Sequence, residues 1–165
     1  RRAFPPKPEK DYSKKVNRKE RQKARLSALA AMADVEIVRQ RGHLFDEGIT
    51  TPVIVEDVFE SLSTTAEVYE ALDMIGVSAD LGRAKDGRKI RPGRGKMRSR
   101  RHKGKRSVLL VVSALEAPLF KGAGNLPGVE IVSADGLNTG RLAPGGMPGR
   151  LAVFSESALK MIGEW

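Results

Sequence analysis

The amino-acid sequence predicts an α/β fold of three layers, in which helices cover both faces of a mostly parallel β-sheet. Three observations predict this fold. Short apolar runs alternate with helical patterns, one run is apolar at nearly every position, and the runs are separated by glycine, proline or polar residues. We expect an extended basic arm over residues 1–16 and a globular α/β domain over residues 17–165, with a basic loop at residues 83–106.

The first predicted helix covers residues 18–33, which are rich in the strong helix formers Ala, Leu, Arg and Lys. Asn17 and Glu20 have the spacing of a capping box, with Asn in the usual place of Ser or Thr. We expect the apolar C-terminal half of this helix to lie in the core and its basic first turns to face phosphate. Cations at a helix N-terminus oppose the macrodipole, and a nearby polyanion would relieve that conflict.

Four strands and two further helices follow along the chain. The run at residues 107–112 is apolar at nearly every position, which is typical of a strand buried on both faces of a parallel sheet. Thr64 and Glu67 form a second capping-box pattern ahead of a helix that ends at Gly76, and Ser155 is expected to cap the closing helix. The other predicted strands cover residues 52–55, 127–132 and 151–154.

Positive charge is concentrated in two segments of the chain. The sequence of 165 residues holds 30 Lys and Arg against 20 Asp and Glu, a formal net charge of +10. Residues 1–25 hold 11 basic and 3 acidic residues, and residues 83–106 hold 13 basic residues and one acid. These segments together carry +20, and the rest of the chain carries −10. Such segregation indicates a polyanionic partner, most simply nucleic acid.

The basic loop cannot bury apolar surface by itself. Its cations repel one another, and four glycines and one proline prevent a long helix, so we expect it to be mobile alone and extended along phosphates when bound. It contains no Phe, Tyr or Trp, which favours binding of folded RNA through shape and backbone over base stacking. A solvated loop or a localisation signal is the weaker alternative. For the proline-rich residues 1–12, two interpretations stay open: an arm that lies on a partner and a frayed terminus.

The candidate RNA contacts are cations of the two basic segments together with the last residue of a Gly/Pro-rich loop at residues 143–150. For that loop, an RNA or protein contact and a plain turn are equally favoured. The candidates are Arg1, Arg2, Lys7, Lys14, Lys15, Arg18, Lys19, Arg83, Lys85, Arg88, Lys89, Arg91, Arg94, Lys96, Arg98, Arg100, Arg101, Lys103, Lys105, Arg106 and Arg150.

No complete catalytic or metal-binding pattern is present in the sequence. The chain has no Cys, which excludes disulfides, thiolate metal sites and cysteine nucleophiles. Glu56 and Asp57 could hold Mg²⁺ in a nuclease, but acids in a first helical turn are the simpler interpretation. His43 and His102 lack suitably spaced partners. We therefore expect no catalytic residue, no metal site and no cofactor.

Five segments in register resemble the large-ribosomal-subunit protein four family, in its archaeal and eukaryotic form. They are RRAFPPK at 1–7, VIVEDVFESL at 53–62, GRGKMRSR at 93–100, NLPGV at 125–129 and LAPGGMPGRLAVFSESAL at 142–159. Family members carry a first strand, a first helix and a long loop before the point that matches Arg1. The resemblance therefore implies that residues 1–7 are the returning arm of that loop and that the N-terminal part is missing.

The same resemblance implies a function and a set of partners. It implies a non-enzymatic, cytoplasmic constituent of the large ribosomal subunit that organises large-subunit rRNA, with a family role near the peptide exit tunnel. It also implies neighbouring large-subunit proteins as partners, and RNA contacts at Arg94, Lys96, Arg98 and Arg100. We expect that the protein does not bind a membrane, has no small-molecule substrate and does not form a homo-oligomer. The alternatives are a metal-dependent nucleic-acid-processing enzyme and a free RNA-binding translational regulator.

Overall fold

The computed structural model describes residues 2–163, so the predicted RNA contact Arg1 lies outside the described residues. The α-helices are α1 (Arg18–Ala30), α2 (Val35–Gln40), α3 (Thr65–Met74), α4 (Ser78–Asp86), α5 (Leu119–Ala123), α6 (Thr139–Leu142) and α7 (Glu156–Gly163). The strands are β1 (Val53–Val55), β2 (Lys89–Ile90), β3 (His102–Lys103), β4 (Leu109–Val112), β5 (Glu130–Ser133) and β6 (Ala152–Ser155). Three short 3-10 helices are η1 (Asp57–Ser61), η2 (Arg94–Met97) and η3 (Pro144–Gly146).

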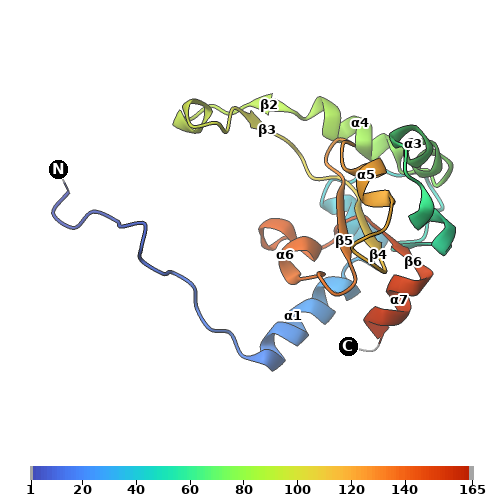
Figure 1. Cartoon of the computed structure of the whole chain (residues 1–165), viewed down its shortest axis with the longest axis horizontal. Helices are drawn as coiled ribbons and strands as arrows, with labels where there is room; N and C mark the ends of the chain where they lie inside the picture. The colour runs from blue at the N-terminus through green and yellow to red at the C-terminus, as the bar shows by residue number, and fades with distance from the viewer. Residues whose placement is uncertain (1, 164–165) are drawn as a thin grey trace.

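A four-stranded parallel sheet forms the centre of the body (Figure 1), in the order β1-β6-β4-β5. Strand β4 lies between two partners, with Leu110 opposite Ile131 on one side and Val153 on the other. All four residues of β4 are buried, as the continuous apolar run predicts. The predicted α/β class with a mostly parallel sheet is therefore confirmed.

Side chains of β4 alternate between the two faces of the sheet and enter two separate apolar clusters. Leu110 and Val112 pack in one cluster with residues of α3, α4 and α5. Leu109 and Val111 pack in the other with residues of α1, α6 and α7. Helices therefore cover both faces of the sheet, as predicted from the sequence.

Two of the three predicted helix caps are present. Thr64 Oγ1 accepts from the Glu67 amide at 3.3 Å, and Glu67 Oε2 accepts from the Thr64 amide at 3.3 Å. Ser155 Oγ accepts from the Ala158 amide at 3.2 Å. The capping box predicted at Asn17 is wrong, because the Asn17 side chain makes no capping hydrogen bond.

The first helix differs from the prediction in its extent. It ends at Ala30, three residues before the expected boundary, although Ala28 and Met32 are buried as expected for its C-terminal half. Leu26 remains half exposed. The sequence analysis also missed α2, α4, α5 and α6, of which three have six residues or fewer and too few turns to establish a period.

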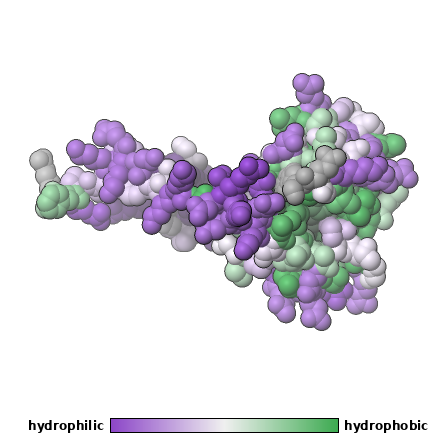
Figure 2. All heavy atoms as spheres, turned by 90° about the horizontal axis from the view of Figure 1, so that it is seen from below, coloured by the Kyte–Doolittle hydropathy of each residue, from purple (hydrophilic) through white to green (hydrophobic). Residues whose placement is uncertain are grey.

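Residues 2–16 form no helix or strand and are exposed along their whole length. Figure 1 shows this arm and the pair β2–β3 projecting from the same side of the body. In Figure 2 the projecting part is mostly hydrophilic, whereas hydrophobic residues gather on the body. Within residues 2–163, no helix is both long enough and apolar enough to cross a lipid bilayer.

Replacement of Leu110 by Ala is expected to destabilise the body by about 2–5 kcal/mol, because it removes a buried side chain at the centre of the sheet and leaves a cavity. The free energy of unfolding, measured by urea denaturation at neutral pH, checks this value. Met74→Ala is the matched control, because Met74 is 85% exposed, and its replacement should change stability by no more than about 0.5 kcal/mol. Equal effects of the two substitutions would contradict the assignment of β4 to the core.

Candidate nucleic-acid interface

Residues 87–106, here called the basic hairpin, fold back on themselves beyond α4. Strands β2 and β3 pair in antiparallel register, with Lys89 opposite Lys103 and Ile90 opposite His102. The short helix η2 forms the tip, where the amides of Arg98 and Arg100 both donate to the Gly95 carbonyl at 3.1 Å. The first residues of the predicted basic loop, 83–86, instead form the last turn of α4. The sequence analysis missed this pairing, which satisfies backbone groups while leaving the side chains in solvent.

Most cations of the basic segment lie on the surface, as phosphate contacts require. The exposed ones are Lys85, Arg88, Lys89, Arg94, Lys96, Arg98, Arg100, Arg101, Lys103, Lys105 and Arg106. Arg91 is partly buried and donates from Nε to the Arg100 carbonyl at 3.2 Å. Side-chain charge therefore points outward along both strands and the tip.

Residues on either side of the basic hairpin are held together by the buried carboxylate of Asp80. Asp80 Oδ1 accepts from Arg83 Nε at 2.7 Å, and Oδ2 accepts from Ser107 Oγ at 2.6 Å. His43 Nδ1 lies 3.0 Å from Oδ2, so this ring nitrogen carries the proton and donates. Arg83 Nη2 also donates to the Arg106 carbonyl at 2.7 Å. Arg83 was predicted as an RNA contact, but in the structure its guanidinium donates to Asp80 and to the Arg106 carbonyl.

Asp80 is ionised in this arrangement. Burial by itself raises the pKa of Asp80, but hydrogen bonds from His43, Arg83 and Ser107 outweigh burial and hold the pKa well below its usual range. Although Ser, His and Asp meet here, the serine and the imidazole both donate to the carboxylate. A catalytic triad requires the imidazole to stand between the other two groups. The cluster is therefore an anchor for the hairpin.

A second carboxylate, the partly buried Glu130 at the start of β5, is surrounded by three arginines. Arg150 Nη1 lies 2.5 Å from Glu130 Oε2, Arg106 Nη1 lies 2.5 Å from Oε1, and Arg141 Nη1 also contacts Oε1. Burial raises the pKa of Glu130, but the hydrogen bond from Arg150 and the charges of Arg150, Arg106 and Arg141 lower it overall. Burial lowers the pKa of Arg150, and Glu130 opposes that effect.

The structure does not support the prediction that Arg150 contacts RNA. Its side chain is completely buried, and it donates to Glu130, to the Ser107 carbonyl at 3.3 Å and to the Arg141 carbonyl at 2.8 Å. Sequence reasoning placed Arg150 on the surface because it follows a Gly/Pro-rich loop. The end of that loop packs closely, because a Cβ on Gly149, whose φ is +79°, would lie 2.6 Å from Ile37 Cγ2.

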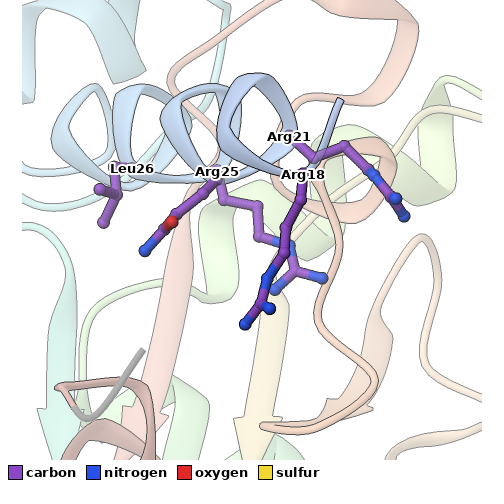
Figure 3. Close-up of a pocket in the computed structure, with 5 residues that line it drawn as sticks. Arg18, Arg21, Arg25 and Leu26 are labelled. Carbon is purple, nitrogen blue, oxygen red and sulfur yellow. The ribbon is translucent and has the colours of Figure 1, made fainter. Parts of the chain in front are cut away.

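The N-terminal arm and the start of α1 form the second basic surface. Its predicted contacts Arg2, Lys7, Lys14, Lys15, Arg18 and Lys19 are all exposed. Figure 3 shows Arg18 and Arg25 extending from the same side of α1, and with Arg21 they line a surface hollow. Arg21 and Arg25 were missed as candidates. Their spacing from Arg18, three and seven residues, places all three near one face of a helix and could have identified them.

Of the two carboxylates considered for catalysis, Asp57 has a structural partner. Asp57 accepts hydrogen bonds from the Ser157 amide at 2.9 Å and from Ser157 Oγ at 2.5 Å, which lower its pKa. Asp57 thus ties η1 to the first turn of α7, and Glu56 directly precedes η1. In residues 2–163, no group of three or more His, Asp or Glu side chains is arranged to hold a metal ion. The simpler interpretation, acids in a first helical turn, is confirmed for Asp57.

Comparisons with known proteins give one consistent result. The ribosomal protein L4/L1 family matches residues 1–165. The chain is 49% identical to the large ribosomal subunit protein uL4 of Archaeoglobus fulgidus over 165 residues, which are 100% of this chain and 64% of that protein. It is 47% identical to uL4 of Halorubrum lacusprofundi, over 99% of this chain and 65% of that protein. It is 48% identical to uL4 of Methanocaldococcus jannaschii, over 99% of this chain and 64% of that protein. The chain thus spans slightly less than two thirds of these relatives.

The buried Asp80 predicts a pH dependence of stability. The pKa of Asp80 is lower in the folded chain than the unfolded value of about 3.9, so protonation favours unfolding. The stabilisation from Asp80 is fully present above that unfolded pKa and is lost as the pH falls below it. Asp80→Asn should cost about 3–5 kcal/mol at pH 7 and should make stability depend less on pH below about 4.

Urea denaturation at a series of pH values measures both effects. Asp86→Asn is the matched control, because Asp86 is an exposed acid at the end of the same helix. We expect its stability curve to run parallel to that of the unchanged protein. A parallel curve for Asp80→Asn as well would contradict the role of Asp80.

Proposed function

The chain belongs to the ribosomal protein L4/L1 family, and on that premise we propose that it is a structural, non-enzymatic constituent of the large ribosomal subunit that binds and organises large-subunit rRNA. The observation that carries the proposal is the placement of charge. Two basic extensions, the arm and the basic hairpin, project from the same side of a body whose remaining residues are acidic in sum. A polyanion on that side can contact both extensions at once.

Binding in this proposal is mainly electrostatic. Exposed lysines and arginines neutralise phosphates and release counterions, which gives affinity without reading the base sequence. Arginine can hold two phosphate oxygens with its planar fork, whereas lysine acts as a point charge. The tip residues Arg94, Lys96, Arg98 and Arg100 are the first candidates, because they are exposed at the part of the hairpin farthest along the chain from its anchored ends.

The hairpin and arm are suited to bridging separate RNA segments. The hairpin is anchored at Asp80 and the arm leads into α1, so the two basic extensions originate at different points of one body. Phosphates bound by both would be held at a defined separation. The proposal includes neighbouring large-subunit proteins as partners of the acidic body, a cytoplasmic location in the ribosome, and the family role near the peptide exit tunnel.

Replacement of Arg94, Lys96, Arg98 and Arg100 by Ala is expected to weaken binding to large-subunit rRNA roughly 100-fold or more at moderate salt, because four phosphate contacts are lost. The slope of the logarithm of affinity against the logarithm of salt should decrease by about 3. Filter binding from low to high salt measures both quantities, and urea denaturation shows that the body remains folded.

The matched control removes three exposed cations of the body that lie outside the basic segments, Arg39, Lys121 and Lys160. We expect this control to change affinity by less than about three-fold, since it affects only the long-range charge. Equal losses in the two variants would mean that net charge, and not the hairpin, determines binding. Co-sedimentation with large subunits at moderate salt separates a permanent constituent from a free translational regulator.

A further inference from the structure

Three arginines share one carboxylate at the base of the basic hairpin. Arg106, the last residue of the hairpin, and Arg141, in α6, both contact Oε1 of Glu130, and Arg150 binds Oε2. Arg141 lies outside both basic segments, so charge patterning along the sequence does not identify it. Arg106, Arg141, Arg150 and Glu130 are called the arginine cluster below.

The arginine cluster carries more positive charge than its single acid neutralises. Within residues 2–163, the only carboxylate that forms an ion pair with these three arginines is Glu130. Arg41 adds a further positive charge close enough to lower the pKa of Arg150, which burial already lowers. Arg150 needs Glu130 most, because it is completely buried and one of its terminal nitrogens, Nη2, has no hydrogen-bond partner. The positive charges of Arg106 and Arg141 are therefore only partly neutralised by Glu130, and an anion outside the body can bind them.

The two outer arginines are positioned to bind such an anion together. Their side chains are 58% and 46% exposed, and both donate from Nη1 to the same oxygen of Glu130, which holds the two guanidinium groups next to each other. Each guanidinium has further N–H donors beyond the one given to Glu130. The backbone of Arg141 is fixed as well, because its amide donates to Asn138 Oδ1 at 3.0 Å and its carbonyl accepts from Arg150 at 2.8 Å.

We propose that Arg106 and Arg141 together bind one RNA phosphate, and that Glu130 is the positioning residue that holds them side by side. The proposal rests on the proposed function, since it takes RNA as the polyanion. A phosphate fits because paired guanidinium forks can hold its oxygens with several charge-assisted hydrogen bonds. RNA is favoured over an isolated anion because Arg106 continues the exposed cations of the hairpin, with Lys103 and Lys105 just before it.

The position of this contact gives it a distinct role. Asp80 fixes the hairpin to the body, and the arginine cluster would fix the RNA at that same base, while the tip binds farther along. The two contacts together would determine the direction in which the hairpin crosses the RNA. Loss of Arg141 should therefore weaken binding even though the hairpin itself is unchanged.

Arg141→Ala is expected to weaken binding to large-subunit rRNA about five-fold or more, because a charge-assisted phosphate contact is lost. The double variant Arg106→Ala with Arg141→Ala should lower the salt slope by about 0.7–0.9, the value for one phosphate. A decrease twice as large would show that the two arginines bind separate phosphates and would overturn the shared site. Filter binding over a salt series provides both numbers.

Lys160→Ala is the matched control, because it removes one exposed cation from α7, outside the basic segments; it should leave affinity within two-fold. Thermal unfolding of each variant monitors the fold. An unchanged affinity of Arg141→Ala, with or without a lower melting temperature, would mean that the cluster is purely structural and would overturn the proposal. If the tip variant loses affinity while Arg141→Ala does not, only this inference fails, whereas unchanged affinity in both removes the proposed function too.

The role of Glu130 has a separate readout. Glu130→Gln increases the net charge of the chain by one, so tighter RNA binding is expected if Glu130 merely repels phosphate. A positioning role predicts the opposite, weaker binding, because the two outer arginines lose the charge that holds them together. Should this variant fail to fold because Arg150 is left without a counter-charge, the Arg141→Ala and double variants still decide the proposal.

Discussion

One buried carboxylate, Asp80, and one partly buried carboxylate, Glu130, hold a strongly cationic segment against an apolar body, and the arrangement of the molecule depends on them. Asp80 binds Arg83 and Ser107, which flank the basic hairpin, and Glu130 binds Arg106, the last residue of the hairpin. A buried charge is tolerated only when it is paired and hydrogen-bonded. Each carboxylate therefore accepts only a specific set of partners, which makes the start of the hairpin well defined.

The parallel sheet brings these groups together. Ser107 lies before β4, Glu130 begins β5 and Arg150 lies before β6, and these three strands are adjacent and run in the same direction. Their amino ends consequently meet at one edge of the sheet. Glu60, which follows β1, binds Ser113 and Ser155 at the carboxyl ends of β4 and β6, and Asp57 binds Ser157 in the first turn of α7. Arginines paired with Glu130 are thus gathered at the amino ends of the strands, and acids that bind serines lie at the carboxyl ends.

The parts of the fold that sequence reasoning predicted depend on neighbouring residues. The strand over β4 follows from a continuous apolar run, and the cap of α3 follows from Thr64 and Glu67, three residues apart. The cap at Asn17 failed although its spacing is similar, because suitable spacing permits a hydrogen bond without requiring it. The pairing of β2 with β3 was missed because strands of two residues leave no alternation to detect.

Composition and local periodicity are enough to identify the α/β class and the division of charge between basic segments and an acidic body. Which cations face solvent depends on contacts between residues that are distant in sequence. Arg141 and Arg150 are nine residues apart in the sequence and bind the same carboxylate, yet Arg150 is completely buried and Arg141 is half exposed. Their positions follow from the order and register of strands distant in sequence, because a guanidinium is buried only where folding brings a carboxylate to it.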